Sequence, residues 1–389
     1  MAHDLQQRLA KEGELAKRME ALGHGGLPFI TRPFLAVHFS LEVYTARTAL
    51  LLARDLGFES RLRRGCTLDE LLEGLHPQSR FPIGWMLPFL ADEGLLREDG
   101  HRYHLDGEPD LDLAEIRAFV DREAPGQNIG FNLIDAVRSR VGPFFTEGRQ
   151  GESLLFDLSV YPLWLEYFRE DNLAYAPNNL LALWALRDEL RDGSRILELG
   201  GGAGSFASLF AKTCAEAGCL SKVAEYRFTD LAPAFLRRAQ RELPGHAPGL
   251  PLVFGALDIN RPLGDQGLGE ARFDLITGIN VLHVAKDLVP TLRELRAHLA
   301  PGGCLVVGEC LKPRIDRPVF TEYFFQFMRG YTEVNLDPVL RPIHGFLTAD
   351  AWEANLRAAG FTRIEHRPDT RKIVPFFPNF NAGALLAWG

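Results

Sequence analysis

The chain is poor in cysteine, and it has no long run of uncharged apolar residues. Its 389 residues include 5 cysteines, an odd number, and none of them forms the C-x-x-C spacing of a zinc or redox motif. This pattern predicts free, mostly packed thiols in a reducing compartment. The first twenty residues are polar and lack the apolar core of a signal peptide. We therefore expect a cytoplasmic protein with no membrane segment.

Runs of lysine and arginine are also missing. The 43 Lys and Arg residues are outnumbered by 51 Asp and Glu residues, which gives a net charge of −8. A protein that binds nucleic acid along its phosphates presents a basic face. The composition argues against such a face, so we expect no nucleic-acid partner. The hydrophobic fraction of 46% and the charged fraction of 24% are typical of ordinary globular domains.

Residues 1–120 predict three helices followed by a small hairpin. Helices are expected at Thr45–Leu56, from Thr67 onwards and at Ser79–Glu93. The next stretch, GLLREDGHRYHLDG, alternates like two short strands with Asp99-Gly100 as the turn. This order is typical of a winged helix-turn-helix, so we expect a mainly helical, winged-helix-like N-terminal domain.

Winged helices often bind DNA, and the net charge of residues 1–120 tests whether this one is expected to do so. Residues 1–120 contain 19 Asp and Glu but only 14 Lys and Arg. The third helix, which would enter a DNA groove, has Arg80 but also Asp92 and Glu93, and it is otherwise apolar. A regulator that binds a small molecule as its ligand stays an alternative. The apolar surplus favours a homodimer interface or packing against a second domain.

Two further regions follow. Residues 121–190 are expected to be a helical linker rich in aromatic residues. Most of these should form an ordinary core, but their density just before the next motif also suits a lid over a pocket. Residues 191–389 alternate between short apolar strands and helices, which predicts a Rossmann-like α/β fold with a seven-stranded, mostly parallel sheet. The expected strands are Arg195–Leu199, Glu225–Thr229, Pro251–Gly255, Phe273–Gly278, Cys304–Glu309, Thr362–His366 and Ala384–Trp388.

The helices expected between these strands lie at residues 205–217, 233–242 and 287–299, with a later one at Ala349–Ala359 that Gly360 would cap. The segment Ala300-Pro301-Gly302-Gly303 predicts a helix stop and a turn before the fifth strand.

The most informative segment is ILELGGGAGS, in which a buried strand ends in an acid and a glycine-rich turn opens a helix. Such a turn lets a ligand approach the backbone at the carboxyl edge of a sheet, near a helix N-terminus. The dinucleotide fingerprint G-x-G-x-x-G would need a glycine where Ser205 stands. The spacing is instead E-x-G-x-G-x-G, formed by Glu198, Gly200, Gly202 and Gly204.

This spacing resembles motif I of class I methyltransferases, which take their methyl group from S-adenosylmethionine (SAM). Asp230, at the end of YRFTDLAP, can accept hydrogen bonds from both ribose hydroxyls. Asp258 and Ile259, in GALDIN, stand where that family places residues near the adenine. Asn280, in ITGINVLH, belongs to the segment at the active-site edge. The resemblance implies that these residues bind SAM.

Methyl transfer from a sulfonium requires an aligned nucleophile, and a hydroxyl or carbon acid must also lose a proton. His283 is the candidate base because it follows the fourth strand at the sheet edge expected to hold the cofactor. Glu309 ends the next strand, where its carboxylate can orient the imidazole. A packed or capping role for His283 stays open.

A closer resemblance covers residues 140–388. The segments FFTEGRQGESLLF, EYRFTDLAPAFL, INVLHVAKDL and HLAPGGCLVVGE are similar to those of polyketide synthase C-methyltransferase domains. In that family a His and a Glu at the positions of His283 and Glu309 form a dyad that deprotonates an activated carbon. The resemblance implies C-methylation of a small natural-product-like molecule.

The whole chain also resembles winged-helix-containing small-molecule O-methyltransferases, which dimerise through the N-terminal region and deprotonate a phenol with a similarly placed His. They usually have His-Asp or His-Asn before a Trp, where this chain has His283-Val284-Ala285, and often an acid where this chain has His344. O-methylation of a phenol or acid therefore stays an alternative.

Four further residues are candidates near the substrate. His344 could line the pocket or join His283 and Glu309 around a metal ion, although a packing role is the simpler expectation and we predict no metal. Arg329, Tyr331 and Arg341 could meet an anionic substrate, or they could be ordinary helix and loop residues.

Overall fold

The computed structural model describes residues 2–22 and 27–389, and its internal contacts divide the chain into two compact units. Unit 1 contains Met1–Tyr167, Asn172–Ala174 and Arg314–Thr332. Unit 2 contains Phe168–Asp171, Tyr175–Pro313 and Glu333–Gly389. The segment Arg314–Thr332 therefore packs with residues that precede it by more than a hundred positions, which the sequence pattern alone did not indicate.

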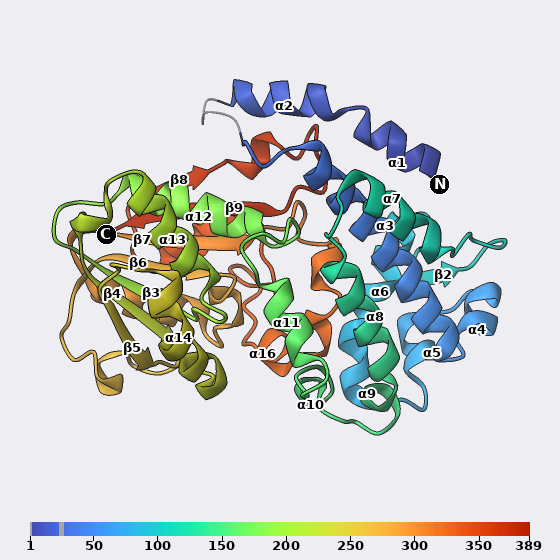
Figure 1. Ribbon diagram of the computed structural model, residues 1–389. Helices are drawn as coiled ribbons and strands as arrows, with labels where there is room; N and C mark the ends of the chain where they lie inside the picture. Colours follow the sequence, from blue (N-terminus) through green and yellow to red (C-terminus); the bar gives the residue numbers. More distant parts are fainter. Residues whose placement is uncertain (1, 23–26) are drawn as a thin grey trace. The chain divides into compact units, whose positions relative to one another are not determined.

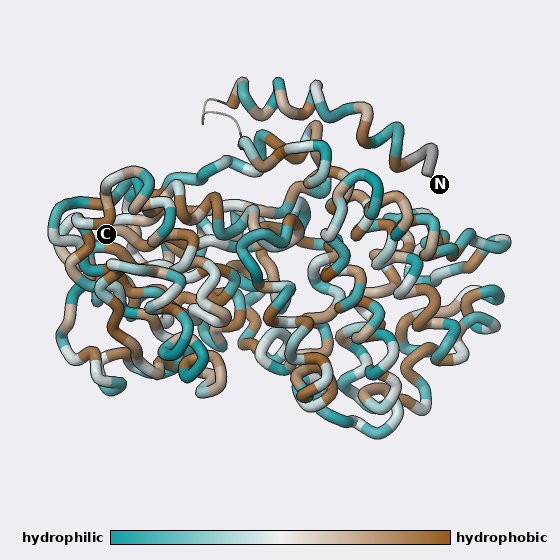
Figure 2. The backbone as a smooth tube through the Cα atoms, in the orientation of Figure 1, coloured by the Kyte–Doolittle hydropathy of each residue, from teal (hydrophilic) through white to brown (hydrophobic). Residues whose placement is uncertain are grey.

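Unit 1 is almost entirely helical (Figure 1). Its α-helices are α1 (Ala2–Leu9), α2 (Glu12–Ala21), α3 (Arg32–Asp55), α4 (Glu59–Arg64), α5 (Leu68–Leu72), α6 (Arg80–Asp92), α7 (Leu113–Glu123), α8 (Ile129–Arg140), α9 (Gly142–Thr146), α10 (Gly151–Leu155), α11 (Tyr161–Tyr167) and α16 (Arg329–Thr332). Its 3₁₀ turns are η1 (Pro77–Ser79), η5 (Phe320–Glu322) and η6 (Phe325–Phe327). In α2 the chain alternates between hydrophilic and hydrophobic residues (Figure 2), and Leu15 and Met19 are buried.

Helix α3 is much longer than the sequence predicted. It starts at Arg32 rather than Thr45, because the Thr31 hydroxyl accepts a hydrogen bond from the Phe34 N–H and Pro33 occupies the first turn. Its polar residues, such as Glu42 and Thr45, are buried together with the apolar ones. A helix that is buried all round shows no amphipathic period, which is why the pattern revealed only its second half.

The two helices and the hairpin that follow differ from expectation in detail. Thr67 caps α5 through a capping box with Glu70, as a start at Thr67 predicts, but α5 ends after five residues. Strands β1 (Arg97–Asp99) and β2 (Arg102–His104) pair antiparallel with Asp99 opposite Arg102. The turn is therefore Gly100-His101, one residue later than predicted, and Gly100 takes the positive φ of +61°.

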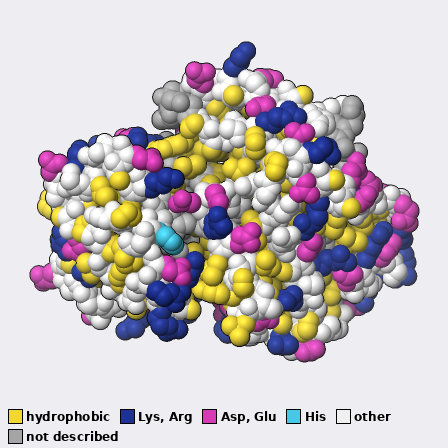
Figure 3. All heavy atoms as spheres, viewed as in Figure 1, with side chains coloured by type: hydrophobic (Ala, Val, Ile, Leu, Met, Phe, Trp, Pro, Cys, Tyr) yellow, Lys and Arg dark blue, Asp and Glu magenta, His cyan; other side chains and the backbone are white. Residues whose placement is uncertain are grey.

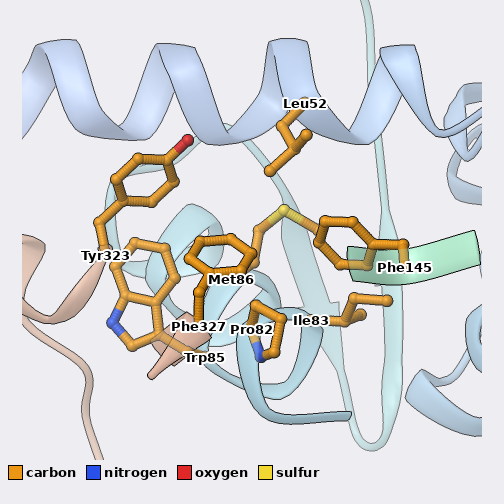
Figure 4. Close-up of a pocket in the computed structure, with 8 residues that line it drawn as sticks. All are labelled: Leu52, Pro82, Ile83, Trp85, Met86, Phe145, Tyr323 and Phe327. Carbon is orange, nitrogen blue, oxygen red and sulfur yellow. The ribbon is translucent and has the colours of Figure 1, made fainter. Parts of the chain in front are cut away.

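The apolar side of α6 is buried within unit 1. The indole N–H of Trp85 donates to the Val319 carbonyl at 3.2 Å, and its ring stacks on Phe89. The apolar surplus of this helix is thus used in packing against the segment Arg314–Thr332. A small cavity remains in this core, and Figure 4 shows the side chains that line it: Leu52, Pro82, Ile83, Trp85, Met86, Phe145, Tyr323 and Phe327.

Unit 2 is built on a seven-stranded sheet, which confirms the predicted α/β fold. The strands are β3 (Ser194–Leu199), β4 (Val223–Asp230), β5 (Leu252–Ala256), β6 (Phe273–Ile279), β7 (Leu299–Cys310), β8 (Arg363–Arg367) and β9 (Ala382–Trp388). Their order is β5-β4-β3-β6-β7-β9-β8. The first five are parallel, and β9 runs antiparallel to both of its neighbours.

Helices cover this sheet. They are α12 (Ala176–Asp188), α13 (Ser205–Glu216), α14 (Pro233–His246), α15 (Leu288–Ala297) and α17 (Ala349–Ala358). The 3₁₀ turns are η2 (Leu220–Lys222), η3 (Gly264–Gln266), η4 (Leu282–Val284) and η7 (Thr370–Lys372). Helix α12 lies over β7 and β9 and contacts α13 (Figure 1). Helix α15 packs against α17.

The prediction that Ala300–Gly303 form a turn before the fifth strand is wrong, because these residues lie inside β7. The pairing of β7 with β6 jumps from Phe273 opposite Leu299 to Leu275 opposite Cys304. Gly302 takes a φ of +73° within this irregularity. The segment therefore forms a bulge in a strand that starts earlier than expected.

All five cysteines are free thiols, as their number and spacing predicted. Among the described residues, none of the helices is both long and apolar enough to cross a membrane. On the face seen in Figure 3, acidic and basic side chains are largely interspersed.

Candidate active site

The carboxyl ends of five neighbouring parallel strands meet at one edge of the unit 2 sheet. Because ligands of open α/β sheets bind outside these ends, this edge is where the predicted site residues should gather. The structure brings the glycine-rich loop, Asp230, Asp258, Asn280, His283 and Glu309 to this edge.

The glycine-rich loop joins β3 to α13. A side chain at Gly200 would place its Cβ 2.5 Å from Val281 Cγ2, so the close packing excludes any larger residue. A Cβ at Gly202 would lie 3.9 Å from the Gly200 carbonyl oxygen, an ordinary contact, but the φ of +54° is a backbone conformation that requires glycine. Gly204, at the N-terminus of α13, has no side chain to cap the helix, which leaves backbone N–H groups available to a ligand.

Asp230 is buried at the end of β4 and holds this loop. Its Oδ2 accepts the Gly202 N–H at 2.8 Å, and its Oδ1 accepts the Ala232 N–H at 2.7 Å. Burial raises the pKa of Asp230, and these two backbone hydrogen bonds oppose the rise. A carboxylate has about four acceptor positions, so two lone-pair directions remain for a ligand's hydroxyls.

Glu198 lies inside β3 and is almost fully buried. Its Oε2 accepts the Tyr226 hydroxyl at 3.0 Å. Burial raises the pKa of Glu198 from 4.5 to about 8, the Tyr226 hydrogen bond opposes the rise, and the Asp230 charge adds to it. Burial therefore favours the neutral form of this carboxyl group more than it would in an exposed glutamate.

Asp258 and Ile259 follow β5. The Asp258 Oδ1 accepts the Asn260 N–H at 2.9 Å, and the Asp258 N–H donates to Gln266 Oε1 at 2.7 Å. The Ile259 carbonyl accepts the Thr291 hydroxyl at 3.2 Å. The loop is therefore fixed from both sides, and sequence reasoning missed Gln266 because it stands eight residues away without a motif.

Asn280 is the only described non-glycine residue with a positive φ, at +51°. Its Oδ1 accepts the Cys310 N–H and the Asn178 side-chain amide, each at 3.1 Å. Asn280 thus ties the ends of β6 and β7 to α12. The sequence analysis missed Asn178 and its neighbour Asn179, whose amide donates to Ser205 Oγ at 3.2 Å; two adjacent amides at the start of an apolar helix were the available signal.

His283 and Glu309 contact each other directly. The His283 Nδ1 lies 2.7 Å from Glu309 Oε2. The Glu309 Oε1 accepts the backbone N–H groups of Leu282 at 2.9 Å and of His283 at 3.2 Å. Because a carboxylate only accepts hydrogen bonds, Nδ1 carries the proton and Nε2 keeps the lone pair of a base.

Two further residues of unit 2 hold the turn η4, which carries His283. The Phe346 ring packs edge to face on the imidazole with centroids 4.8 Å apart. Arg341 is buried and donates to the backbone carbonyls of His283 and Ala285. Two terminal nitrogens of Arg341 are thus used within the protein, contrary to the expectation that they face a substrate.

The remaining predicted substrate residues lie on two other segments of the chain. His344 belongs to the same connection as Phe346, between β7 and α17. Arg329 and Tyr331 belong to α16 in unit 1, where the Tyr331 hydroxyl donates to Glu322 at 2.9 Å. Within residues 2–22 and 27–389, no group of three or more His, Cys, Asp or Glu residues is arranged to hold a metal ion.

The chain is similar to known proteins in part of its sequence and in its fold. Residues 197–305 match the family described as "Methyltransferase domain". The polyketide synthase ThaG of Burkholderia thailandensis is 31% identical over 258 residues, which are 64% of this chain and 4% of ThaG. The chain spans less than a tenth of the length of the curated relatives it matches first.

Two solved structures share the fold over nearly the whole chain. The CurJ carbon methyltransferase has a TM-score of 0.74 and 20% identity, covering 99% of this chain and 98% of that one. The trans-methyltransferase CalH, solved as a complex with SAH, has a TM-score of 0.62 and 19% identity, with 90% of each chain covered.

Proposed function

We propose that the chain is a class I SAM-dependent methyltransferase and that it methylates an acidic carbon of a small natural-product-like molecule. The observation that carries this proposal is the 2.7 Å contact between His283 Nδ1 and Glu309 Oε2 at the carboxyl edge of the sheet. A buried carboxylate that fixes the imidazole leaves Nε2 as a general base.

The residues at the sheet edge fit SAM. The side-chain-free backbone at Gly202 and the uncapped N-terminus of α13 suit its amino-acid end, and the two remaining acceptor positions of Asp230 suit the ribose hydroxyls. Asp258 and Ile259 would contact the adenine, with Glu198 and Asn280 supporting the loop ends. When bound, SAM supplies an electrophilic methyl group.

In the proposed mechanism, Nε2 of His283 removes a proton from the substrate carbon. Glu309 stays ionised and stabilises the imidazolium that forms, as a carboxylate partner does in other acid–base pairs. The electron pair left on carbon is delocalised into a neighbouring carbonyl group, which gives the enolate-like nucleophile. His344, Tyr331 and Arg329 are proposed as substrate contacts.

Polyketide synthases among the relatives suggest a substrate class. A 3-oxoacyl thioester is the natural probe, because the carbon between its two carbonyl groups is acidic. NMR of the product made with ¹³C-methyl SAM should show the new methyl group on carbon. A label on oxygen would favour O-methylation by the same His, and no product from either this probe or a phenol would contradict the proposal.

We propose two roles for the N-terminal part of the chain. Residues 1–120 would form a winged-helix-like domain that makes a homodimer, and residues 121–190 would act as a lid. Sedimentation at micromolar concentration tests the dimer, and a monomer at all concentrations would remove it. A mobility shift with DNA at physiological salt would revive the regulator alternative.

A further inference from the structure

The turn that carries His283 is short and makes few hydrogen bonds of its own. Turn η4 spans only Leu282–Val284, and its local bonds are Val284 N–H to the Val281 carbonyl at 3.2 Å and Ala285 N–H to the Leu282 carbonyl at 3.1 Å. Three residues of 3₁₀ helix do not hold a fixed direction alone. The orientation of the imidazole must therefore come from the groups packed around the turn.

Glu309 and Arg341 bind opposite kinds of backbone group in this turn. Glu309 accepts the N–H groups of Leu282 and His283. Arg341 donates to the carbonyl groups of His283 and Ala285. We propose that Arg341 is a positioning residue that holds the turn from the carbonyl side and so fixes the His283 imidazole for proton removal. This inference rests on the proposed function of His283 as the base.

Arg341 is itself held in place. Its side chain is buried, and its backbone exchanges two 2.9 Å hydrogen bonds with Asp337. The Asp337 carboxylate accepts the N–H groups of Val339 and Leu340, each at 2.8 Å. This loop is therefore folded on itself rather than extended.

The same loop is anchored to the chain that follows the turn. The Asn335 N–H donates to the Lys286 carbonyl at 2.9 Å, and its side-chain amide donates to Asp287 at 2.8 Å. The loop thus contacts four positions within and just beyond the turn: His283 and Ala285 through Arg341, and Lys286 and Asp287 through Asn335. Because this loop is held by its own hydrogen bonds, it can fix the orientation of a turn that has few of its own.

Arginine is suited to this task. Its planar guanidinium presents several N–H groups in a fixed fork, so that one side chain can bind two carbonyl groups two residues apart. The lysine ammonium is a point charge on a flexible stem and cannot span both in the same way. Replacement by lysine therefore keeps the charge but loses the fork.

The test compares Arg341→Gln and Arg341→Lys with the control Arg293→Lys. Arg293 also donates to a backbone carbonyl, that of Ala358 at 2.9 Å, but it is exposed on α15. Hydrogen exchange of the Leu282 and His283 amides, SAH affinity by calorimetry, and kcat and KM for the 3-oxoacyl thioester are measured for each. A misplacement of about 1 Å can cost about 10²-fold in rate.

We expect both Arg341 variants to exchange the two amides faster and to lose about 10- to 100-fold in kcat, with the smaller loss in Arg341→Lys. SAH affinity should stay within about two-fold, and the control should match the wild type. Unchanged exchange and kcat would overturn the proposal. So would an equal loss of SAH affinity, or failure of both variants to fold, since either marks a general structural role. Full turnover in His283→Ala would instead contradict the proposed function.

Discussion

Glu309 Oε2 lies 2.7 Å from His283 Nδ1, although 26 residues separate them in the chain. His283 follows β6 and Glu309 lies near the end of the neighbouring parallel strand β7, so the sheet brings them to the same edge. Both side chains are buried, with 3% and 0% of their surfaces exposed. Burying a carboxylate without hydrogen-bond partners costs free energy. Glu309 has three partners, the Leu282 N–H, the His283 N–H and His283 Nδ1, which offset that cost.

Replacing His283 by Ala should remove the base and reduce turnover by about 10²-fold or more, because a positioned base typically contributes about 10²- to 10⁴-fold. SAH affinity measured by calorimetry should change little. His366→Ala is the matched control. The His366 side chain also pairs with a carboxylate, that of Glu353 at 3.0 Å, but His366 lies on β8, away from the proposed site. Wild-type turnover in His283→Ala would dismiss it as the base.

Glu309→Gln should also reduce kcat, by about 10-fold or more, without weakening SAH binding. The amide keeps the size of the carboxylate but carries no charge to stabilise an imidazolium, and its NH₂ group cannot accept a hydrogen bond. Steady-state kinetics with the 3-oxoacyl thioester give the comparison. A loss confined to KM would point to substrate binding instead of catalysis.

Gly202→Arg should abolish SAH binding in calorimetry, because it places a long cation in the loop proposed to hold the ligand and strains a residue with φ of +54°. Gly218→Arg is the control. Gly218 has a comparable φ of +68° and open space, but it follows α13 at its other end. Binding retained by Gly202→Arg would remove the cofactor assignment.

Glu198→Gln should be more stable than the wild type at pH 8, and the difference should vanish at low pH. Burial raises the pKa of Glu198 from 4.5 to about 8 in the folded state. The folded wild type therefore binds more protons than the unfolded chain between these values, and its stability relative to the neutral variant falls as pH rises through that window. Each pH unit corresponds to at most about 1.4 kcal/mol.

Thermal unfolding of both proteins from pH 4 to pH 9 measures this difference. The gap in Tm should widen from pH 4.5 to about 8 and then level off. Because only the difference between two proteins is used, other titrating groups cancel where they lie far from Glu198. A gap that is the same at every pH would contradict the ionisation of Glu198 in this window.

Strong local patterns allowed much of unit 2 to be predicted. Apolar strands such as β3 and β6 alternate with amphipathic helices, and their bounds came out within one or two residues of prediction. The prediction was poorer where tertiary contacts overrode the local pattern. Helix α3 is buried on every side, and the glycine-proline segment that signalled a turn lies within β7 as a bulge.

In the candidate site, too, local features could be predicted and contacts between distant residues could not. Motif spacing indicated Glu198, Gly202, Asp230 and His283, since a backbone loop and its neighbouring acids are local features. For Arg341 the sequence left open a contact with an anionic substrate or an ordinary loop role, and in the structure its terminal nitrogens bind the His283 and Ala285 carbonyls. Nothing in the residues around Arg341 carries that information, because its partners lie more than fifty positions away.

The amino-acid sequence by itself determined the order of strands and helices, the glycine turn and the kinds of side chain at the strand ends, because hydrophobic period and backbone conformation are local properties. Only the tertiary structure decided that Arg314–Thr332 joins the N-terminal unit, that Glu309 accepts three hydrogen bonds, and which groups hold the histidine turn. Those contacts join residues far apart in the chain, and they form only when the whole sheet and its connections pack together.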